Sequence, residues 1–284
     1  MIKFSVLIPT YNNLNYLKLA INSIKDNSIY EHEIILHIND GSDGTLNYAK
    51  NNKLIYTYSN DNIGLCSAIN KASTKVSTQY VLYVHDDMYL CKNWDQILEN
   101  EIKSLDNDLF YFSGTNYENR DIDMSFNPGN SPEQFNPNDF HKFCVTKNEK
   151  DLQGSHWAPH IISKRLWDMV GGFSEEFNPG DGSDPDFCMK LWNNKVRIFK
   201  SIDKFKVFHF GSTTTRKRNV IKNNGTKKFL LKYGFNPKFF RKYYLNGGAD
   251  SIYDGPLSEP QDSLIKSIDL LINKIKFFYY KVST

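Results

Sequence analysis

Short apolar runs alternate with helical periodicity over residues 1–115, and this alternation limits the chain to few folds. Apolar residues spaced every three or four positions predict helices from Leu17 to Ile24, Leu65 to Ala72 and Trp94 to Leu105. The runs between them predict strands at Phe4 to Ile8, Glu33 to Ile38, Leu54 to Tyr58, Tyr80 to Val84 and Leu109 to Phe112. We therefore expect an α/β fold with a mostly parallel central sheet and helices on both faces.

The alternation stops at residue 116. Residues 116–150 are rich in Asn, Pro, Asp and Ser and have little periodicity, which predicts a long excursion with short elements. Helical patterning returns at Ser163 to Val170 and at Pro185 to Asn194. Strands are expected at Val196 to Phe199 and Lys206 to Phe210.

Composition excludes several classes of protein. A formal net charge of +3 is too small to indicate nucleic acid as the main partner. The four cysteines are scattered without a CxxC pair, so neither a zinc site nor a disulfide framework is predicted, and reduced thiols in a cytoplasmic protein are expected. The apolar stretch from Phe4 to Ile8 is too short for a signal peptide, and no run of about 18 apolar residues could span a membrane.

Three predicted strands end in polar clusters, at residues 9–12 (PTYN), 39–42 (NDGS) and 85–87 (HDD). Ligands of an open parallel sheet bind beyond the carboxyl ends of its strands, so the three clusters should meet at one edge. The glycine-rich phosphate motifs GxGxxG and GxxxxGK[ST] do not occur. A nucleotide would then need a divalent cation to carry its diphosphate, with Asp86 and Asp87 as candidate ligands. The alternative to a metal site is that Asp86 and Asp87 simply form a capped acidic turn after the strand.

The segment NPGDGSDPDFCMKLW, residues 178–192, holds a second group of acids. Asp184 before Pro185 could be a helix N-cap. A carboxylate at a helix N-terminus is expected to stay ionised at neutral pH and can accept a proton from an attacking hydroxyl. Asp181, Asp184 and Asp186 are the candidates, and Asp186 is expected to brace the backbone of the first helical turn.

Two further sites stay open on the residues alone. His209 follows an apolar strand and is either a satisfied core residue or a third metal ligand. The basic run Arg216 to Arg218 is either solvated surface or closes over a diphosphate.

The C-terminal stretch SLIKSIDLLINKIKFFYYK places Leu264, Ile268, Leu271 and Ile275 on one side of a helix, with lysines between. Such a helix packs on its own domain or on a second chain, or it lies on an anionic membrane.

Taken together, the motifs resemble those of the GT-A-fold glycosyltransferases of family 2, which are inverting nucleotide-sugar transferases. The matching segments follow the family's order over residues 3–215: SVLIPTYNN, INDGSDGT, NDNIGLCSAIN, YVLYVHDDMYLCKNW, VGGFSEEFNPGDGSDPDFCMKLW and VFHFGSTT. The resemblance implies a GT-A domain with a nucleotide-sugar-binding half at 1–115 and an acceptor-binding and catalytic half at 116–220. Residues 221–284 would form a C-terminal helical extension.

The resemblance also implies a role for individual residues. Asp184 would be the general base, and Asp87 and His209 would ligate Mn²⁺ or Mg²⁺. The segment QGSHWAPH would face the acceptor, where Trp157 either stacks on a sugar or is a core aromatic. The acceptor side would comprise His156, Trp157 and Asp181. The donor side would comprise Pro9, Thr10, Tyr11, Asp40, Asn62, Gly64 and Asp86, with Asp86 near the ribose or the metal.

Two residues depart from the family pattern. His85 stands where the motif has an acid or amide, and Ser183 stands where a glutamate usually precedes the base. The implied function is metal-dependent transfer of a sugar from a nucleotide-diphosphate donor, with a UDP-sugar favoured. The acceptor would be a saccharide or lipid-linked saccharide in surface polysaccharide or glycoconjugate synthesis. The implied location is the cytoplasm or the inner face of the membrane. The alternative is a non-catalytic module that binds nucleotide sugar or glycan. A nucleotidyltransferase is disfavoured because PTYNN occupies the place of its glycine-rich loop.

Overall fold

Nine strands form a single sheet in the computed structural model, which describes residues 3–118, 121–122, 126–147, 150–211, 223–248 and 251–282. The predicted basic run Arg216 to Arg218 lies outside the described residues. The strand order is β3-β2-β1-β4-β8-β6-β9-β5, with β7 paired to β9. The strands are β1 (Ser5–Tyr11), β2 (Glu33–Asn39), β3 (Ile55–Ser59), β4 (Tyr80–Tyr83), β5 (Met88–Leu90), β6 (Phe110–Tyr117), β7 (Leu152–Gln153), β8 (His160–Ser163) and β9 (Ile198–His209).

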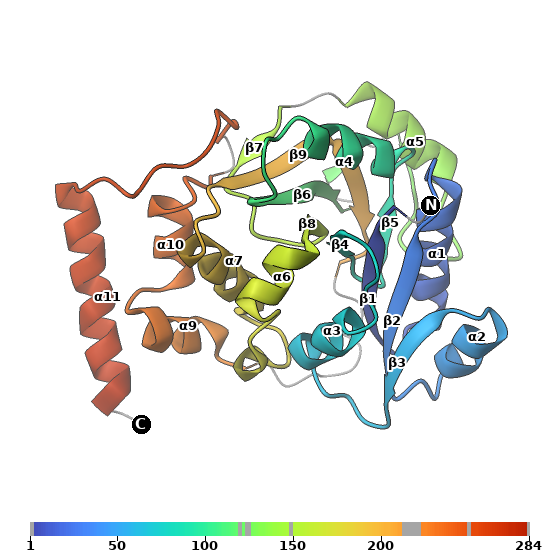
Figure 1. The fold of residues 1–284 in the computed structure, drawn as a ribbon, viewed down its shortest axis with the longest axis horizontal. Helices are drawn as coiled ribbons and strands as arrows, with labels where there is room; N and C mark the ends of the chain where they lie inside the picture. Colours follow the sequence, from blue (N-terminus) through green and yellow to red (C-terminus); the bar gives the residue numbers. More distant parts are fainter. Residues whose placement is uncertain are drawn as a thin grey trace.

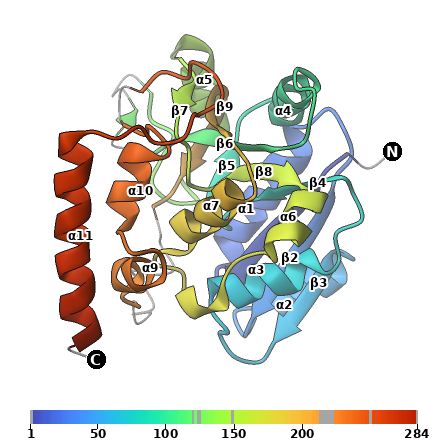
Figure 2. The same cartoon turned by 60° about the vertical axis from the view of Figure 1, so that its left-hand side comes forward.

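The half of the sheet formed by β3, β2, β1 and β4 is parallel throughout. Right-handed crossovers put α1 on one face of it and α3 on the other, as Figures 1 and 2 show. The helices of this half are α1 (Leu14–Asp26), α2 (Thr45–Asn51), α3 (Leu65–Ser73) and α4 (Trp94–Lys103). The predicted alternation is therefore confirmed here, although the seven-residue α2 was not predicted.

The other half is mixed, because β8 pairs antiparallel with both β4 and β6. The two strands predicted at 196–199 and 206–210 are one strand, β9, and that prediction was wrong. A bulge opposite Gly114 and Thr115 shifts the register by three residues, so the polar stretch that suggested a break is accommodated inside the strand. The remaining helices of this half are α5 (Pro137–Thr146), α6 (Lys164–Val170), the 3₁₀ turn η2 (Glu175–Phe177) and α7 (Ser183–Asn193).

The C-terminal extension consists of α9 (Gly225–Tyr233), α10 (Pro237–Tyr243) and α11 (Leu264–Val282). Phe229, Phe239 and Phe240 are buried and join the same apolar core as the sheet. The extension is therefore packed on the domain, and Figure 1 shows α11 at its outer edge beside α9 and α10.

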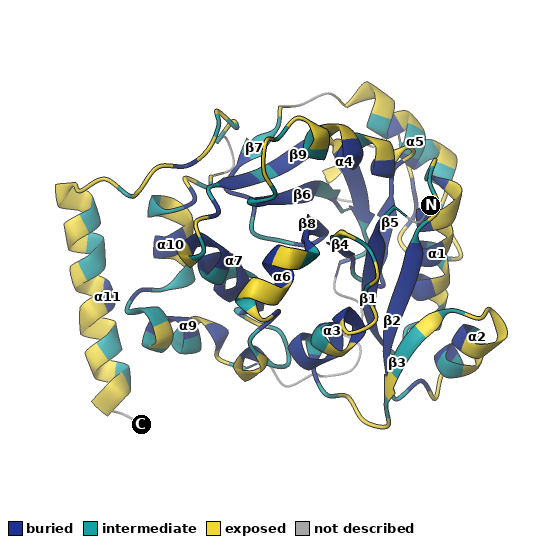
Figure 3. Ribbon diagram, viewed as in Figure 1, coloured by how far each residue is buried: buried dark blue, intermediate teal, exposed yellow. Residues whose placement is uncertain are grey.

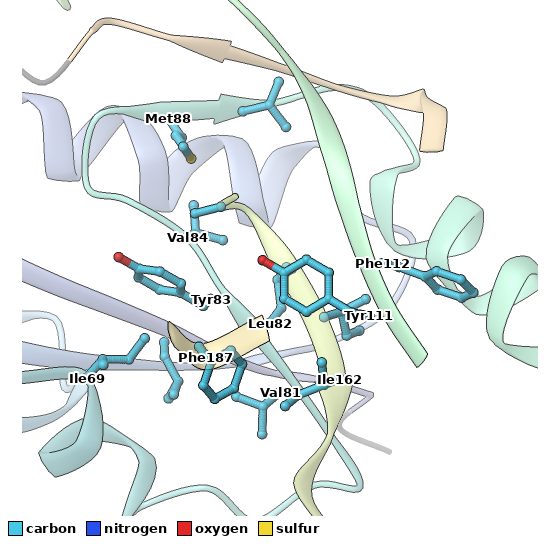
Figure 4. Close-up of a cluster of buried hydrophobic side chains, with 14 of the residues drawn as sticks. Ile69, Val81, Leu82, Tyr83, Val84, Met88, Tyr111, Phe112, Ile162 and Phe187 are labelled. Atoms are coloured by element: carbon cyan, nitrogen blue, oxygen red, sulfur yellow. The ribbon is translucent and has the colours of Figure 1, made fainter. Parts of the chain in front are cut away.

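The core lies between the sheet and the helices on its two faces, where most strands are buried, while the edge strand β3 is partly exposed (Figure 3). Val81, Leu82 and Val84 are buried as predicted for a strand covered on both sides. Figure 4 shows Val81 and Leu82 near Phe187, which comes from α7. This packing fixes the end of β4, where the acidic cluster begins.

Candidate active site

The three predicted strand-end clusters meet at one edge of the sheet. Asn12 follows β1, and its amide donates to Asp40 Oδ2 over 2.6 Å and to Ser42 Oγ over 3.2 Å. Asp40 follows β2 and adopts a left-handed backbone with φ 63°, which turns the chain back toward β1. The parallel register of β1 and β2, with Tyr11 opposite Asn39, brings these turns together.

The two acids of the cluster after β4 have different partners: Asp86 contacts Asn13, and Asp87 contacts His209. Asp86 Oδ1 accepts a hydrogen bond of 3.1 Å from Asn13. Asn13 precedes α1 but makes no side-chain capping bond there, and Asp43 accepts from the Leu14 N–H instead. Burial and the charge of Asp87 raise the pKa of Asp86, while Thr10 and Asn13 act in the opposite direction.

Asp87 lies on the other side, against His209. The antiparallel pairing of β5 with β9 puts Met88 opposite His209, and the Phe210 N–H donates to the Asp87 carbonyl over 3.1 Å. Asp87 Oδ1 is 3.3 Å from His209 Nε2. Although burial acts to lower it, the Asp87 carboxylate, with Glu118 and Asp86, raises the pKa of His209 above its usual value.

His85 completes this group. Its ligand atom, a carboxylate oxygen of Asp87 and a ring nitrogen of His209 all lie within 4.8 Å of one another. Burial, and next the charge of His209, lower the pKa of His85 to about 4, so its imidazole is neutral at pH 7 and keeps a lone pair. His209 Nε2 is buried and makes no well-formed hydrogen bond within the described residues. One carboxylate and two imidazoles around a common point fit a divalent cation.

Asp184 lies in the first turn of α7, and its charge acts on Tyr83 of β4 and Tyr111 of β6. The helix begins at Ser183 with Gly182 at the N-cap, so the prediction that Asp184 is the N-cap was wrong. Burial raises its pKa to about 7, and its Oδ1 is buried without a hydrogen-bond partner in the described ranges. The carboxylate was expected to stay ionised at neutral pH, but a pKa of about 7 leaves it only partly ionised there, because the loss of hydration outweighs the helix N-terminus.

Tyr83 connects Asp184 with the cluster after β4. Its pKa is raised well above the usual value by burial, and the charges of Asp184, Asp86 and Asp87 add to this. Its ring contacts His85, with ring centroids 5.3 Å apart. The Tyr83 ring also contacts Phe173, at 5.7 Å between centroids, and Phe173 stacks on Phe187 of α7. Asp184 and the aspartates after β4 therefore share one electrostatic neighbourhood around this side chain.

A close contact joins α3 to the segment before α7. The Asn178 side chain accepts from the Cys66 N–H over 2.9 Å and donates to Ser67 Oγ over 2.7 Å. A Cβ at Gly64 would collide with the Asn178 amide, so only glycine fits there. Cys66 is buried beneath this contact, and burial, with Asp184 next, raises the pKa of its thiol to about 12. Asn62 is exposed and accepts from the Gly64 N–H, so it shapes this turn.

His156 and Trp157 lie in the loop that leads into β8. Because β8 pairs antiparallel with β4, with His160 opposite Tyr83, this loop reaches the same edge as His85. Both side chains are half-buried. The Trp157 ring nitrogen donates to the Gly114 carbonyl over 3.1 Å, which fixes the ring and leaves part of it open.

The other two acids of α7 and its preceding loop hold the C-terminal extension. Asp181 is exposed and accepts from the Gly225 N–H over 2.9 Å. Asp186 is fully buried, where Lys232 lies 2.7 Å away and the Tyr233 hydroxyl donates over 2.8 Å. The expectation that Asp186 braces the helix backbone was wrong, because both of its partners come from α9.

Sequence reasoning missed three residues of this site: His85 beside Asp87 and His209, Asn178 as a cap on α3, and Glu118. Glu118 follows β6 and acts electrostatically on His209. The rule that polar residues gather after strands could have found Glu118, since Leu109 to Phe112 was predicted as a strand. Of the donor-side residues, Pro9 and Thr10 are buried at the end of β1, and Tyr11 is half-buried beside them.

Comparison with known proteins finds relatives among hyaluronan and chondroitin synthases. The chain is 27% identical over 229 residues to a hyaluronan synthase of Pasteurella multocida, covering 78% of this chain and 22% of that protein. It is 27% identical over 267 residues to a chondroitin synthase of Pasteurella multocida strain Pm70, covering 87% of this chain and 26% of that protein. The chain thus spans about a quarter of the length of these relatives.

The fold is also similar to that of S. aureus TarS, residues 1–349, solved in complex with UDP. The TM-score is 0.52 at 19% identity, over 73% of this chain and 60% of that one. The family model described as glycosyl transferase family 2 matches residues 5–160. The chain therefore belongs to glycosyl transferase family 2 and has the GT-A fold.

Proposed function

We propose that this protein is an inverting glycosyltransferase that moves a sugar from a nucleoside diphosphate to a hydroxyl of a saccharide acceptor, in polysaccharide or glycoconjugate synthesis. Family membership supports the reaction class. The observation that carries the mechanism is the placement of Asp184, with a pKa of about 7, in the neighbourhood of the acidic cluster after β4.

The donor is assigned to the edge formed by the ends of β1, β2 and β4. Pro9, Thr10 and Tyr11 would line the nucleotide, and Asp40 would contact its base. Asn62 and Gly64 would shape the turn beside it, and Asp86 would lie near the ribose. UDP is the favoured nucleotide, because a structurally similar protein was solved with UDP.

Asp184 is assigned as the general base. In a single displacement, its carboxylate takes the proton of the acceptor hydroxyl as that oxygen bonds to the anomeric carbon. The bond from this carbon to the phosphate oxygen breaks, and the nucleoside diphosphate leaves with the electron pair. One displacement inverts the configuration. A base with a pKa near 7 is half ionised at neutral pH and still basic enough to take the proton.

Asp87 and His209 are assigned as metal ligands. A bound Mn²⁺ or Mg²⁺ supplies Lewis-acid neutralisation of the leaving diphosphate. These side chains are held by the pairing of β5 with β9, so their positions do not depend on a mobile loop.

The acceptor side is assigned to His156, Trp157 and Asp181. The half-buried Trp157 ring, fixed through its N–H, is suited to stack on a sugar face. The other oxygen of the exposed Asp181 carboxylate would accept from a sugar hydroxyl. A saccharide or lipid-linked saccharide is the acceptor class.

Helix α11 is assigned to peripheral contact with an anionic membrane. Its packed side faces α9 and α10, where Asn273 is buried. The opposite side exposes apolar residues, visible as the yellow outer helix in Figure 3: Leu264, Ile268, Leu271, Ile272, Ile275, Tyr279 and Val282. No acid follows Asp269 in the helix, whereas Lys274, Lys276 and Lys281 do. Apolar area flanked by lysine is the composition of interfacial helices. No helix within the described ranges is long and apolar enough to cross a bilayer.

The direct test is release of nucleoside diphosphate from a panel of nucleotide sugars, with Mn²⁺ and saccharide acceptors. Asp87→Ala and Asp184→Asn should each nearly abolish release, with unchanged circular dichroism. Normal turnover in both variants would refute the assignment. Calorimetric donor binding without turnover on any acceptor would instead favour a non-catalytic binding module.

A further inference from the structure

The three consecutive residues His85, Asp86 and Asp87 in the turn after β4 point their side chains in two directions, toward Asn13 and toward His209. The Met88 N–H donates to the His85 carbonyl over 3.3 Å, which closes the turn. Asp86 at its centre bonds to Asn13. His85 and Asp87, on either side of Asp86, both approach His209. The histidine that departs from the family pattern therefore lies with the metal ligands and not with the donor edge.

The distances suit one ion. The ligand atoms of His85, Asp87 and His209 lie within 4.8 Å of one another. Two ligands on opposite sides of a cation, with bonds of roughly 2.1 Å, are roughly 4.2 Å apart. The largest of these separations must therefore shorten by roughly 0.6 Å or more for one ion to bind all three, and a partly exposed imidazole can make that shift. The His85 and His209 rings, 5.6 Å apart between centroids and inclined by 64°, neither stack nor block each other.

Imidazole changes which ion such a site prefers. Mg²⁺ takes oxygen ligands and is held through one or two carboxylates with waters and phosphate. Nitrogen ligands suit ions further along the first transition series. A site with one carboxylate and two imidazoles should therefore bind Co²⁺ far better than Mg²⁺.

We infer that His85 is a third metal ligand, and that the His85–Asp87–His209 site selects a transition-metal ion over Mg²⁺. The inference rests on the proposed function only in that the ion would serve the donor diphosphate. The binding itself can be measured on the full chain without turnover.

Titration of the full chain with Co²⁺, followed by calorimetry and by visible absorption, tests the site. One Co²⁺ should bind per chain, and excess Mg²⁺ should displace it poorly. His85→Ala should weaken Co²⁺ binding by at least about tenfold and change the spectrum. His85→Asp should narrow the preference for Co²⁺ over Mg²⁺. His141→Ala, which changes a half-buried histidine on α5, is the matched control and should bind as the wild type does.

Unchanged Co²⁺ affinity and spectrum in His85→Ala would overturn the inference, as would absence of Co²⁺ binding by the wild type. Melting temperatures of each variant show whether a loss of binding reflects unfolding, and His85→Asp gives a second variant that keeps a ligand. Intact, His85-dependent Co²⁺ binding without sugar transfer would defeat the proposed function and support the site. Sugar transfer together with Co²⁺ binding that is unchanged in His85→Ala would support the proposed function and defeat the inference about His85.

Discussion

Asn178, in the segment before α7, packs its carboxamide against Gly64 at the start of α3 and accepts from the Cys66 N–H. Leu65 N–H also donates to the Pro179 carbonyl, over 3.2 Å. The N-terminus of α3, which follows β3 on the donor side, is therefore capped by the segment that leads into the proposed catalytic helix. A substitution that disturbs this contact should therefore affect both the donor side at α3 and the proposed catalytic helix α7.

Gly64→Ala should destabilise the protein by about 3 kcal/mol or more, because Gly64 has φ 83° and ψ 164°, a region that costs other residues roughly 1–3 kcal/mol, and a methyl group would also displace Asn178. Gly234→Ala is the matched control, since Gly234 has φ 81° but nothing within 4 Å of its Cβ. Its cost should be about 1 kcal/mol. Chemical denaturation measures both, and equal costs would contradict the close contact.

The reaction rate should depend on the ionisation of Asp184. Its pKa of about 7 predicts that kcat/KM rises with pH up to about 7 and levels off above it. Asp184→Asn should lower kcat by roughly 10²- to 10⁴-fold and remove this dependence. A pH–rate profile of the wild type that is flat from pH 5 to pH 8 would exclude Asp184 as the base.

The same group should make stability depend on pH. The folded pKa of Asp184 lies above its unfolded value of 3.8, so the folded state holds the extra proton between about pH 4 and pH 7. Its contribution to stability is present below pH 4 and is lost as pH rises through 7. Asp184→Asn should therefore be more stable than the wild type at pH 8 and similar to it near pH 3. Melting curves at both values check this, and a less stable variant at pH 8 would contradict it.

Lys232→Met should destabilise the protein by about 2–4 kcal/mol, because it leaves the fully buried Asp186 without its counter-ion. Adding Asp186→Asn should recover part of the loss, since the buried charge is then gone. Lys164→Met removes an ion pair to the largely exposed Asp168 and should cost only about 0.3–0.5 kcal/mol. Similar losses in Lys232→Met and Lys164→Met would show that the extension is not anchored through Asp186.

Replacing Ile268, Leu271 and Ile275 together by serine should abolish binding to vesicles of anionic phospholipid. Each side chain is about half exposed or more, so the fold should be unaffected, while the loss of apolar area should weaken binding by about a hundredfold or more. Val145→Ser on α5, 85% exposed, is the control. Co-sedimentation measures binding. An unchanged triple variant, or one whose only change is dissociation of an oligomer, would contradict membrane contact.

The sequence predicted elements well wherever one local pattern decided them. The strand at Tyr80 to Val84 and the acids after it could be placed because an apolar run ended abruptly in charge, and strand direction then fixed the shared edge. His209 could be named as a ligand candidate, but its position opposite Met88 depends on an antiparallel pairing that no local pattern specifies. The four-residue β8 was missed because it is too short to show periodicity.

The state of the acids could not be predicted either. A position in the first turn of a helix suggested that Asp184 would be ionised, yet surroundings contributed by other elements raise its pKa. Asp186, two residues later in the helix, has the same local context but meets Lys232 and Tyr233 from α9. Two carboxylates of the same helical turn thus acquire different surroundings from elements distant in the sequence: Asp186 is paired with Lys232, and Asp184 is not paired within the described residues.

The burial of Cys66 under the Gly64–Asn178 contact gives the protein a native chemical reporter. Only the thiolate reacts readily with alkylating reagents, and a pKa of about 12 keeps this sulfur inert while the start of α3 stays covered. Modification of Cys66 then requires the two sides of the domain to part. The rate of Cys66 alkylation would therefore report how often the two sides separate. A bound donor that holds the two sides together would lower this rate.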